Sequence, residues 1–177
     1  MSKATDTIAQ SLNIAVLTVS DTRTENDDTS GQFLVAALQE SNHRAADKQI
    51  VKDDIYQIRA VLSAWIANSD IHTVLITGGT GFSGRDSTPE AVGPLLDKSI
   101  EGYGELFRQL SYEEIGTSTV QSRAVGGLAN NTVIFCMPGS TGACRTAWTG
   151  IIREQLDSTH RPCNFVGVLN VRHQQTR

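Results

Sequence analysis

Glycines and hydroxyls gather after short apolar segments of this chain. Thr77-Gly78-Gly79-Thr80-Gly81 follows one such segment, and Pro138-Gly139-Ser140 follows another. Glycine has no Cβ, so the backbone N–H groups of these runs can approach a ligand closely. A helix that begins just beyond such a loop, as Thr88-Pro89 indicates, adds free N–H groups and the positive end of its dipole. Together these runs predict a phosphate-binding site.

Two aspartates belong to the same set of loops. Asp53 follows the second predicted strand, and Asp86 follows the glycine-rich run within Arg85-Asp86-Ser87-Thr88-Pro89-Glu90. Two carboxylates near a phosphate would repel it, so we expect them to hold a bridging Mg²⁺. Such an ion stabilises the charge that develops in phosphoryl or nucleotidyl transfer. Asp53 and Asp86 are therefore the candidate catalytic and metal-binding residues.

The candidate substrate-binding residues come from the loop after the first predicted strand and from the loops already named. In an open α/β sheet, ligands bind outside the carboxyl ends of the strands, which is where these residues fall. The set is Ser20, Asp28, Ser30, Gly31, Thr77, Gly78, Gly79, Thr80, Gly81, Arg85, Thr88, Pro138, Gly139 and Ser140.

The carboxylates and glycines also have purely structural interpretations. Gly78–Gly81 could simply form a tight turn. Asp53 or Asp54 could be the N-cap of the helix that follows. Asp86 could form an ion pair with Arg85 or with another surface cation. What favours the functional interpretation is the shared location of these residues in the predicted fold.

Other polar and sulfur side chains invite structural interpretations too. Ser140 could be the N-cap of the last long helix, and Ser87 and Glu90 have the spacing of a capping box. We expect Ser122-Arg123 to be a solvated helix end. Cys136 and Cys144 are expected to be small core residues.

One motif points to a different ligand. The run from Gly79 to Gly84 matches G-x-G-x-x-G, the fingerprint of dinucleotide-binding folds. That fingerprint belongs after the first strand of a βαβ unit, whereas here it follows the third predicted strand and the helix is delayed. The pattern G-x-x-x-x-G-K-[ST] of P-loop ATPases is absent from the chain. NAD(P) binding and ordinary P-loop chemistry are therefore disfavoured.

The elements that would position these loops alternate between strands and helices. Short β-branched apolar runs predict strands at 14–19, 48–51, 74–77 and 132–137. Apolar residues at three- and four-residue steps predict helices near 33–38, 55–66 and 147–156. This alternation indicates an α/β fold. Residues 101–127 show no strong strand pattern. We expect residues 165–169 to add an edge strand and residues 171–177 to form a frayed tail.

Composition narrows the classes of protein. The chain has 177 residues, a formal net charge of −4 and 39% hydrophobic residues, which suits one globular domain. A net negative charge does not provide the positive surface that nucleic-acid binding requires. No apolar run approaches the ~20 residues of a membrane span. Residues 1–11 lack the features of a secretory signal. Three cysteines without a CxxC pair argue against disulfides and structural zinc, so a cytoplasmic protein is expected.

Several of these motifs, in this order, resemble one known family, the molybdenum cofactor biosynthesis proteins of the MoaB/MogA type. The resemblance covers about residues 12–170 of what we expect to be a single domain over 1–177. It is carried by Thr18-Val19-Ser20-Asp21, Asp28-Thr29-Ser30-Gly31, Thr77–Gly81, Arg85–Ala91 and Met137-Pro138-Gly139-Ser140. The stretches Glu113–Ser118, Ala143–Trp148 and Arg161–Phe165 resemble the bacterial MoaB branch.

The resemblance implies a three-layer α/β/α sandwich with a mostly parallel central sheet. It also implies homotrimers or hexamers built as dimers of trimers. Adenylyltransferases of the family join AMP from Mg-ATP to the terminal phosphate of molybdopterin. By position, Asp86 matches the family's essential carboxylate and Asp53 its other functional aspartate, while Gly78–Gly81, Ser30 and Ser140 match loops that hold pterin or nucleotide. The alternatives are a non-catalytic pterin- or nucleotide-binding protein and a structural partner in the same pathway.

Overall fold

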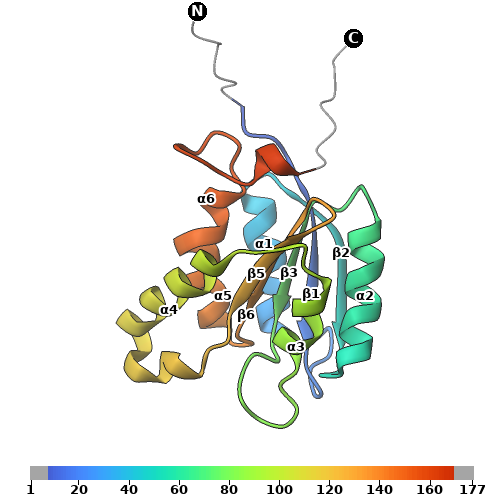
Figure 1. The fold of residues 1–177 in the computed structure, drawn as a ribbon, viewed down its shortest axis with the longest axis vertical. Helices are drawn as coiled ribbons and strands as arrows, with labels where there is room; N and C mark the ends of the chain where they lie inside the picture. Colours follow the sequence, from blue (N-terminus) through green and yellow to red (C-terminus); the bar gives the residue numbers. More distant parts are fainter. Residues whose placement is uncertain (1–7, 170–177) are drawn as a thin grey trace, which may run out of the picture.

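A six-stranded mixed sheet runs through the centre of the computed structural model, which describes residues 8–169 (Figure 1). The spatial order of the strands is β2-β1-β3-β6-β5-β4. Their bounds are β1 Asn13–Val19, β2 Arg44–Val51, β3 Thr73–Thr77, β4 Lys98–Ser99, β5 Val125–Ala129 and β6 Thr132–Met137. The expected C-terminal tail and the first seven residues lie outside the described part of the chain.

The four predicted strands pair in parallel, as their apolar sequences indicate. β1 pairs with both β2 and β3, and β3 pairs with β6. Six of the seven residues of β1 are buried, because helices cover both faces of the sheet. Ile14 and Val16 belong to the core cluster on one face, and Ala15 and Leu17 to the cluster on the other.

Helices form the two outer layers of an α/β/α sandwich (Figure 1). α1, α4, α5 and its continuation pack on one face of the sheet, whereas α2 and α3 pack on the other. The bounds are α1 Thr29–Glu40, α2 Ile55–Ala67, α3 Thr88–Val92, α4 Glu101–Ile115, α5 Thr141–Ala147, the π-helical η3 Trp148–Ile152 and α6 Arg153–Gln155. The 3₁₀ turns are η1 Gly93–Leu95, η2 Gly116–Gln121 and η4 Val166–Val168. The expected fold class is confirmed.

A strand that the apolar pattern does not reveal begins at the end of the segment 101–127. β5 pairs antiparallel with β6, and the short β4 pairs antiparallel with β5. Two of the five residues of β5 are Gly126 and Gly127, which hide its strand character. A Cβ at Gly127 would lie 2.5 Å from Leu96 Cδ1. Glycine is needed here because neighbouring side chains pack directly against the strand.

The expected edge strand at 165–169 is wrong. Val166–Val168 form the turn η4, and Phe165 N donates to Gln155 O at the end of the last helix. Val166 and Leu169 are buried in the α1–α5 layer, so their apolar character serves that core instead. Within residues 8–169, no helix is long and apolar enough to cross a bilayer.

The carboxyl ends of the parallel strands meet at one edge of the sheet, which we call the rim. The register places Val19 opposite Val51, Thr18 opposite Thr77, and Thr77 opposite Met137. The loops that leave the strands here therefore start side by side. His43 and His72 lie just before β2 and β3, at the opposite edge.

Candidate functional site

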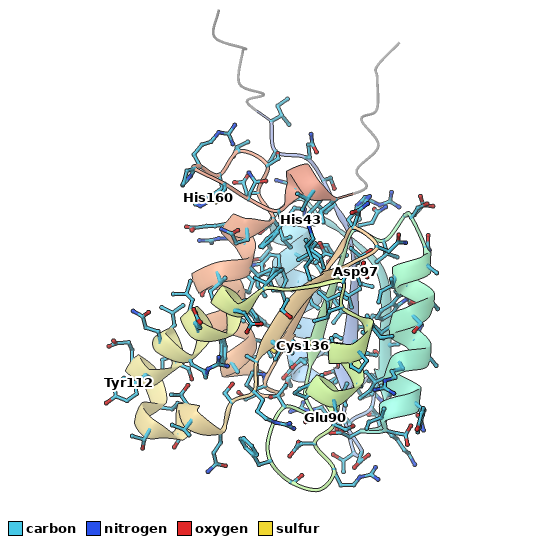
Figure 2. All side chains as sticks on the ribbon, in the orientation of Figure 1. His43, Glu90, Asp97, Tyr112, Cys136 and His160 are labelled. Atoms are coloured by element: carbon cyan, nitrogen blue, oxygen red, sulfur yellow. The ribbon has the colours of Figure 1, made fainter. Side chains whose placement is uncertain are left out.

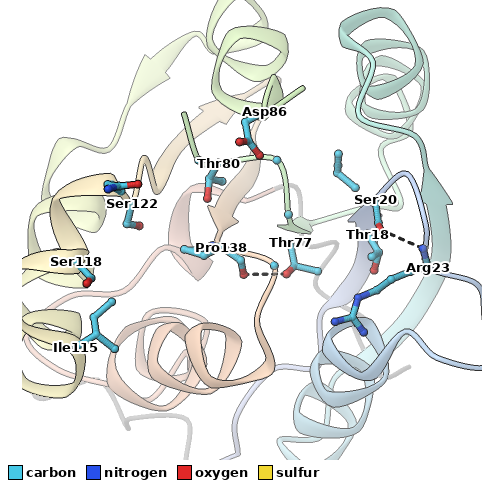
Figure 3. Close-up of a pocket in the computed structure, with 16 residues that line it drawn as sticks. Thr18, Ser20, Arg23, Thr77, Thr80, Asp86, Ile115, Ser118, Ser122 and Pro138 are labelled. Atoms are coloured by element: carbon cyan, nitrogen blue, oxygen red, sulfur yellow. Dashed lines mark hydrogen bonds between the residues drawn. The ribbon is translucent and has the colours of Figure 1, made fainter. Parts of the chain in front are cut away.

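A cavity of about 430 Å³ opens at the rim (Figure 3). The loops after β1, β3 and β6 line it, and η2 with the end of α4 forms the wall opposite β1. The sixteen lining residues are Thr18, Val19, Ser20, Arg23, Thr77, Gly78, Gly79, Thr80, Gly81, Asp86, Ile115, Ser118, Gln121, Ser122, Pro138 and Gly139. Nine of them belong to the predicted catalytic and binding set.

The glycine-rich loop after β3 forms the floor between the walls. Gly78 has φ +103°, and its N–H donates to Met137 O at 3.0 Å. A Cβ at Gly78 would lie only 2.1 Å from Val19 O, so only glycine fits against β1. Gly79 also has a positive φ, of 67°. The loop is thus a tight turn, as the structural interpretation held, and it also lines the cavity.

Asp53 and Asp86 both lie beside this loop. A Cβ at Gly79 would be 2.7 Å from Asp53 Oδ2, and a Cβ at Gly81 would be 2.8 Å from Asp86 Oδ2. Asp86 lines the cavity and accepts a hydrogen bond from Ser83 N at 2.7 Å. Asp53 lies behind the loop rather than in the lining. The structure therefore brings the two carboxylates to the same rim, on either side of the glycine backbone.

The structure decides which aspartate caps α2. Asp54 accepts from Tyr56 N and Gln57 N, so it is the N-cap. Asp53 does not cap the helix. It instead accepts hydrogen bonds from both the backbone N–H and the hydroxyl of Ser87.

The predicted capping box of Ser87 and Glu90 is wrong. The Ser87 hydroxyl donates to Asp53, so the Ser87 side chain makes no cap hydrogen bond to α3.

Arg85 pairs with a different aspartate from the one suggested by its position. Its Nε and Nη2 donate to Asp21 Oδ2 and Oδ1 at 2.9 and 2.7 Å. The hydrogen bonds from Arg85 lower the pKa of Asp21. This exposed pair joins the loop after β1 to the loop after β3, outside the cavity lining. The suggested ion pair between Arg85 and Asp86 is not formed.

Asp28 and Gly31 lie beneath the cavity rather than in it. Asp28 is fully buried; it caps α1 through Gly31 N and accepts from the Thr18 hydroxyl. Lys48 Nζ lies 2.9 Å from Asp28 Oδ2. Burial opposes ionisation of Asp28, but Lys48 and these hydrogen bonds lower its pKa overall. Asp28 and these three partners together hold the end of β1 in place.

Three hydroxyl residues predicted to bind substrate instead form hydrogen bonds with the backbone of the loops and of α5. Ser30 donates to Gly139 O, and Thr88 donates to Gly78 O, each at 2.7 Å. Ser140 caps α5 by accepting from Ala143 N, as its structural interpretation proposed. None of the three lines the cavity.

The buried cysteines belong to the core, as expected. Cys136 is buried in β6 (Figure 2). Cys144 lies beneath the cavity, with its Sγ 3.1 Å from Thr77 Oγ1. Burial raises the pKa of the Cys144 thiol to about 11, so it carries no nucleophilic thiolate near neutral pH.

Comparisons with known proteins agree with these motifs. A family model described as "Probable molybdopterin binding domain" matches residues 15–158. Molybdenum cofactor biosynthesis protein B of Escherichia coli (strain K12) is 62% identical over 152 residues, which are 86% of this chain and 89% of that protein. The corresponding Bacillus cereus protein is 49% identical over 142 residues, 80% and 84% of the two chains. This chain belongs to the molybdenum cofactor biosynthesis protein family.

Solved structures of the molybdenum cofactor biosynthesis family share the fold. A crystal structure of molybdenum cofactor biosynthesis protein B superposes with a TM-score of 0.81 at 47% identity, over 83% of this chain and 92% of that one. The tungsten cofactor synthesizing protein MoaB from Pyrococcus furiosus gives 0.76 at 35% identity, over 83% and 93%. The resemblance drawn from the motifs is confirmed.

This family member lines its cavity with several residues that the sequence did not reveal. They are Thr18, Val19, Arg23, Ile115, Ser118, Gln121 and Ser122. Four of these residues, Thr18, Val19, Ile115 and Ser118, lie within the stretches that carry the family resemblance, and that resemblance was the signal that could have found them. The η2 residues show no periodic pattern that would direct them to the rim.

The expected solvated end at Ser122-Arg123 is wrong. Ser122 lines the cavity. The Arg123 guanidinium donates to Gly81 O at 2.9 Å and Asp86 O at 3.1 Å, and it pairs with Glu90. Arg123 therefore joins the η2 wall to the glycine-rich loop.

Proposed function

We propose that this chain acts in molybdenum cofactor biosynthesis by binding molybdopterin in the rim cavity and transferring AMP to it from Mg-ATP. The observation that carries the proposal is the placement of Asp86 and the Gly78–Gly81 backbone in one cavity. Its volume of about 430 Å³ lies within the usual range of small-molecule sites. Glycine backbone N–H groups and the neighbouring hydroxyls suit a phosphorylated ligand.

Asp53 and Asp86 suit Mg²⁺ in the presence of substrate phosphates. Among residues 8–169, no group of three or more acidic, histidine or cysteine side chains forms a metal site. Mg²⁺ commonly binds through only one or two carboxylates, keeping waters and taking the remaining ligands from phosphates. When bound, such an ion neutralises phosphate charge. Asp86 would hold it from the cavity side, and Asp53, oriented by Ser87, from behind the loop.

The reaction needs no protein nucleophile. A terminal phosphate oxygen of molybdopterin attacks the α-phosphorus of ATP, the bond to the bridging oxygen breaks, and pyrophosphate leaves. The glycine-rich loop would place backbone dipoles beside the charge that develops on the phosphoryl oxygens. Cys144 is buried and protonated, and the Ser140 hydroxyl is engaged as a helix cap. Neither residue takes part in this scheme.

A second candidate function is binding of the pterin without transfer. It is favoured by the position of Asp53, whose Oδ1 is engaged by Ser87 and which lies outside the cavity lining. With Oδ1 held by Ser87, Asp53 offers a cation only Oδ2, and Asp86 is the one carboxylate of the two that lines the cavity. Such a protein would shelter or deliver the pterin.

The test is to incubate the purified chain with molybdopterin, ATP and Mg²⁺ and to analyse the pterin by mass spectrometry. Adenylylated molybdopterin together with an equal amount of pyrophosphate supports transfer. Retention of unmodified molybdopterin with no ATP consumed supports the binding function. Failure to retain molybdopterin would overturn both.

We also propose a homotrimer, or a hexamer formed by two trimers, as the resemblance implies. Three large apolar side chains on α4 and η2 are left exposed: Leu106, Tyr112 and Val120. Figure 2 shows Tyr112 near the outer end of α4. Large apolar side chains left exposed in this way support association. The free thiols of Cys136, Cys144 and Cys163 support a reducing compartment, the cytoplasm.

A further inference from the structure

Arg123 holds the second half of the glycine-rich loop by its carbonyl groups. Its Nε donates to Thr80 O at 3.2 Å and to Gly81 O at 2.9 Å, and its Nη2 donates to Asp86 O at 3.1 Å. Its backbone N–H also donates to Thr80 O, at 3.2 Å. These three residues line the rim cavity, whereas Arg123 lies outside the lining (Figure 3). Arg123 therefore acts on the cavity from behind, through the backbone.

The geometry of the peptide bond converts these contacts into an orientation of the loop. The peptide bonds here are trans, and in a planar trans unit the C=O and N–H groups point in opposite directions. The N–H groups of Gly81 and Phe82, which follow the two carbonyls held by Nε, therefore point away from Arg123. Within residues 8–169, no hydrogen bond engages either N–H group. Both are free to donate to a phosphate, and Arg123 fixes their direction.

The peptide unit between Asp86 and Ser87 links Arg123 to Asp53. The Arg123 guanidinium donates to its carbonyl end, and its N–H end, Ser87 N, donates to Asp53 Oδ1 at 3.0 Å. A cation at the negative end of the peptide dipole and a carboxylate at the positive end stabilise the same orientation of this unit. Arg123 therefore helps to position both candidate Mg²⁺ ligands.

The guanidinium of Arg123 is held on its other sides as well. Its Nη1 pairs with Glu90, and its Cζ lies 5.1 Å from the centroid of the Phe82 ring. The side chain is only 22% exposed. Each of the three guanidinium nitrogens donates to a group of the protein. This arrangement suits a residue that positions its neighbours rather than one that binds substrate.

We propose that Arg123 is a positioning residue for adenylyl transfer. It holds the glycine-rich loop so that the N–H groups of Gly81 and Phe82 are presented to the phosphoryl oxygens, and it keeps Asp53 and Asp86 in place beside them. This inference rests on the proposed adenylyl transfer. The oriented donors act most strongly on charge that develops in the transition state, so the loss of Arg123 affects kcat far more than KM.

The test is steady-state adenylyl transfer, with molybdopterin varied at saturating Mg-ATP and kcat expressed per folded molecule from circular dichroism. Arg123→Ala should lower kcat about 100-fold, because a small displacement of the loop misplaces the reacting groups. The KM for molybdopterin should stay within about threefold of the parent's, because the other contacts of the cavity remain.

Chemical rescue separates positioning from a general loss of stability. Arg123 borders a second cavity, of about 450 Å³, through which a small cation can reach the vacated site in Arg123→Ala. Ethylguanidinium should restore part of the lost kcat, because it can donate to the same carbonyls, and ethylammonium at the same concentration should not. Arg123→Lys should likewise stay at least about tenfold below the parent, since an ammonium lacks the planar fork.

Arg59→Ala is the matched control. The Arg59 guanidinium is also partly buried and donates to two backbone carbonyls, Ala91 O at 3.1 Å and Glu90 O at 2.9 Å. Among the described residues, none of its hydrogen bonds reaches the glycine-rich loop. Its loss should lower the urea midpoint of unfolding and leave kcat and KM unchanged.

Glu90→Gln tests the anchor of Arg123. Loss of this partly exposed ion pair should lower kcat about two- to fivefold. In the Arg123→Ala background the same substitution should have no further effect, because Glu90 acts through Arg123.

The outcomes separate this inference from the proposed function. If the parent forms no adenylylated molybdopterin, the proposed transfer fails and the role of Arg123 fails with it. If the parent is active and Arg123→Ala has the same kcat, only the role of Arg123 is overturned. A raised KM with an unchanged kcat, or an equal loss of kcat in Arg59→Ala, would also overturn it. If Arg123→Ala does not fold, Arg123→Lys and Glu90→Gln decide the question by the same comparison.

Discussion

Asp86 is the carboxylate that connects the cavity to its proposed chemistry. It lines the cavity, whereas Asp53 reaches the same loop from behind. Their positions explain why two aspartates separated by 33 residues lie at one rim: each follows a parallel strand at its carboxyl end. The sequence was sufficient to predict this convergence.

Replacing Asp86 by Asn should abolish most of the adenylyl transfer while leaving the fold intact. The amide oxygen can still accept from Ser83 N, but the negative charge that would anchor Mg²⁺ is lost. We expect turnover to fall at least ~100-fold, as when an electrostatic stabiliser is removed from other enzymes. The free energy of unfolding should change by less than about 1 kcal/mol, since the side chain is partly exposed. Turnover assays and urea unfolding measure the two effects.

Asp70→Asn is the matched control for this substitution. Asp70 is an exposed aspartate before β3, at the opposite edge of the sheet, and its loss should change neither quantity. An Asp86→Asn variant as active as the parent would remove Asp86 from the mechanism.

Other candidate residues illustrate where residue-level prediction stops. Asp28, Ser30 and Thr88 belong to the correct loops, yet their side chains point beneath the cavity and fix the backbone that lines it. The sequence places a residue in a loop, but side-chain direction depends on neighbours that are distant along the chain. Thr18 and Lys48 determine the orientation of Asp28, and neither was identifiable as its partner.

At the scale of elements, the turn after β3 depends most strongly on residue type. Gly78→Ala should lower the free energy of unfolding by about 2 kcal/mol or more, because its φ is positive and the new Cβ would clash with Val19 O. Any relaxation would move the floor of the cavity, so molybdopterin affinity should fall as well. Unfolding in urea and calorimetric titration measure these effects.

Gly84→Ala provides the control in the same loop. Nothing lies within 4 Å of a Cβ at Gly84, so this variant should match the parent within about 0.5 kcal/mol. If Gly78→Ala and Gly84→Ala were equally stable, the close approach between Gly78 and β1 would be contradicted.

The entry to β1 depends on two buried histidines. His43 Nδ1 accepts from Leu12 N, and His72 Nδ1 accepts from Asn13 N. Burial lowers the pKa of both histidines, although Asp157 and Asp70 partly offset this effect. Both rings are therefore neutral acceptors when the protein is folded.

Stability should consequently fall as the pH drops below about 6.5. In that range the unfolded histidines bind protons that the folded ones resist, so protonation favours the unfolded state. The free energy of unfolding, measured between pH 7.5 and 5.5, should decline in the parent and decline less in His72→Gln. A slope unchanged in His72→Gln would show that His72 does not contribute to the pH dependence.

Elements were predictable where one apolar pattern dominated. The strands at 14–19, 74–77 and 132–137 and the helix from 55 have no competing interpretation. β5 was not predicted because two of its residues are glycines, which are needed where neighbouring groups pack closely against the strand. The apolar residues of 165–169 were predicted to form a strand, although they fill the core from a turn. Both failures arise because long-range contacts outweighed the local pattern.

At the scale of the whole molecule, the topology explains why one rim collects the chemistry. Four parallel strands end there, and the loops after three of them, β1, β3 and β6, share a cavity although they are distant in sequence. The η2 wall is different, because it reaches the cavity through α4 and the antiparallel β5 rather than from a strand end. No rule about strand ends could have included it.

The most direct test of the account is amide hydrogen exchange of the intact chain with and without saturating molybdopterin, followed by mass spectrometry. Ligand binding should slow exchange in the loops 77–88 and 138–141 and in η2, and should leave segments around His43 and His72 unchanged. If molybdopterin remained bound while these rim loops exchanged at their original rates, the site would lie elsewhere and the account would be wrong.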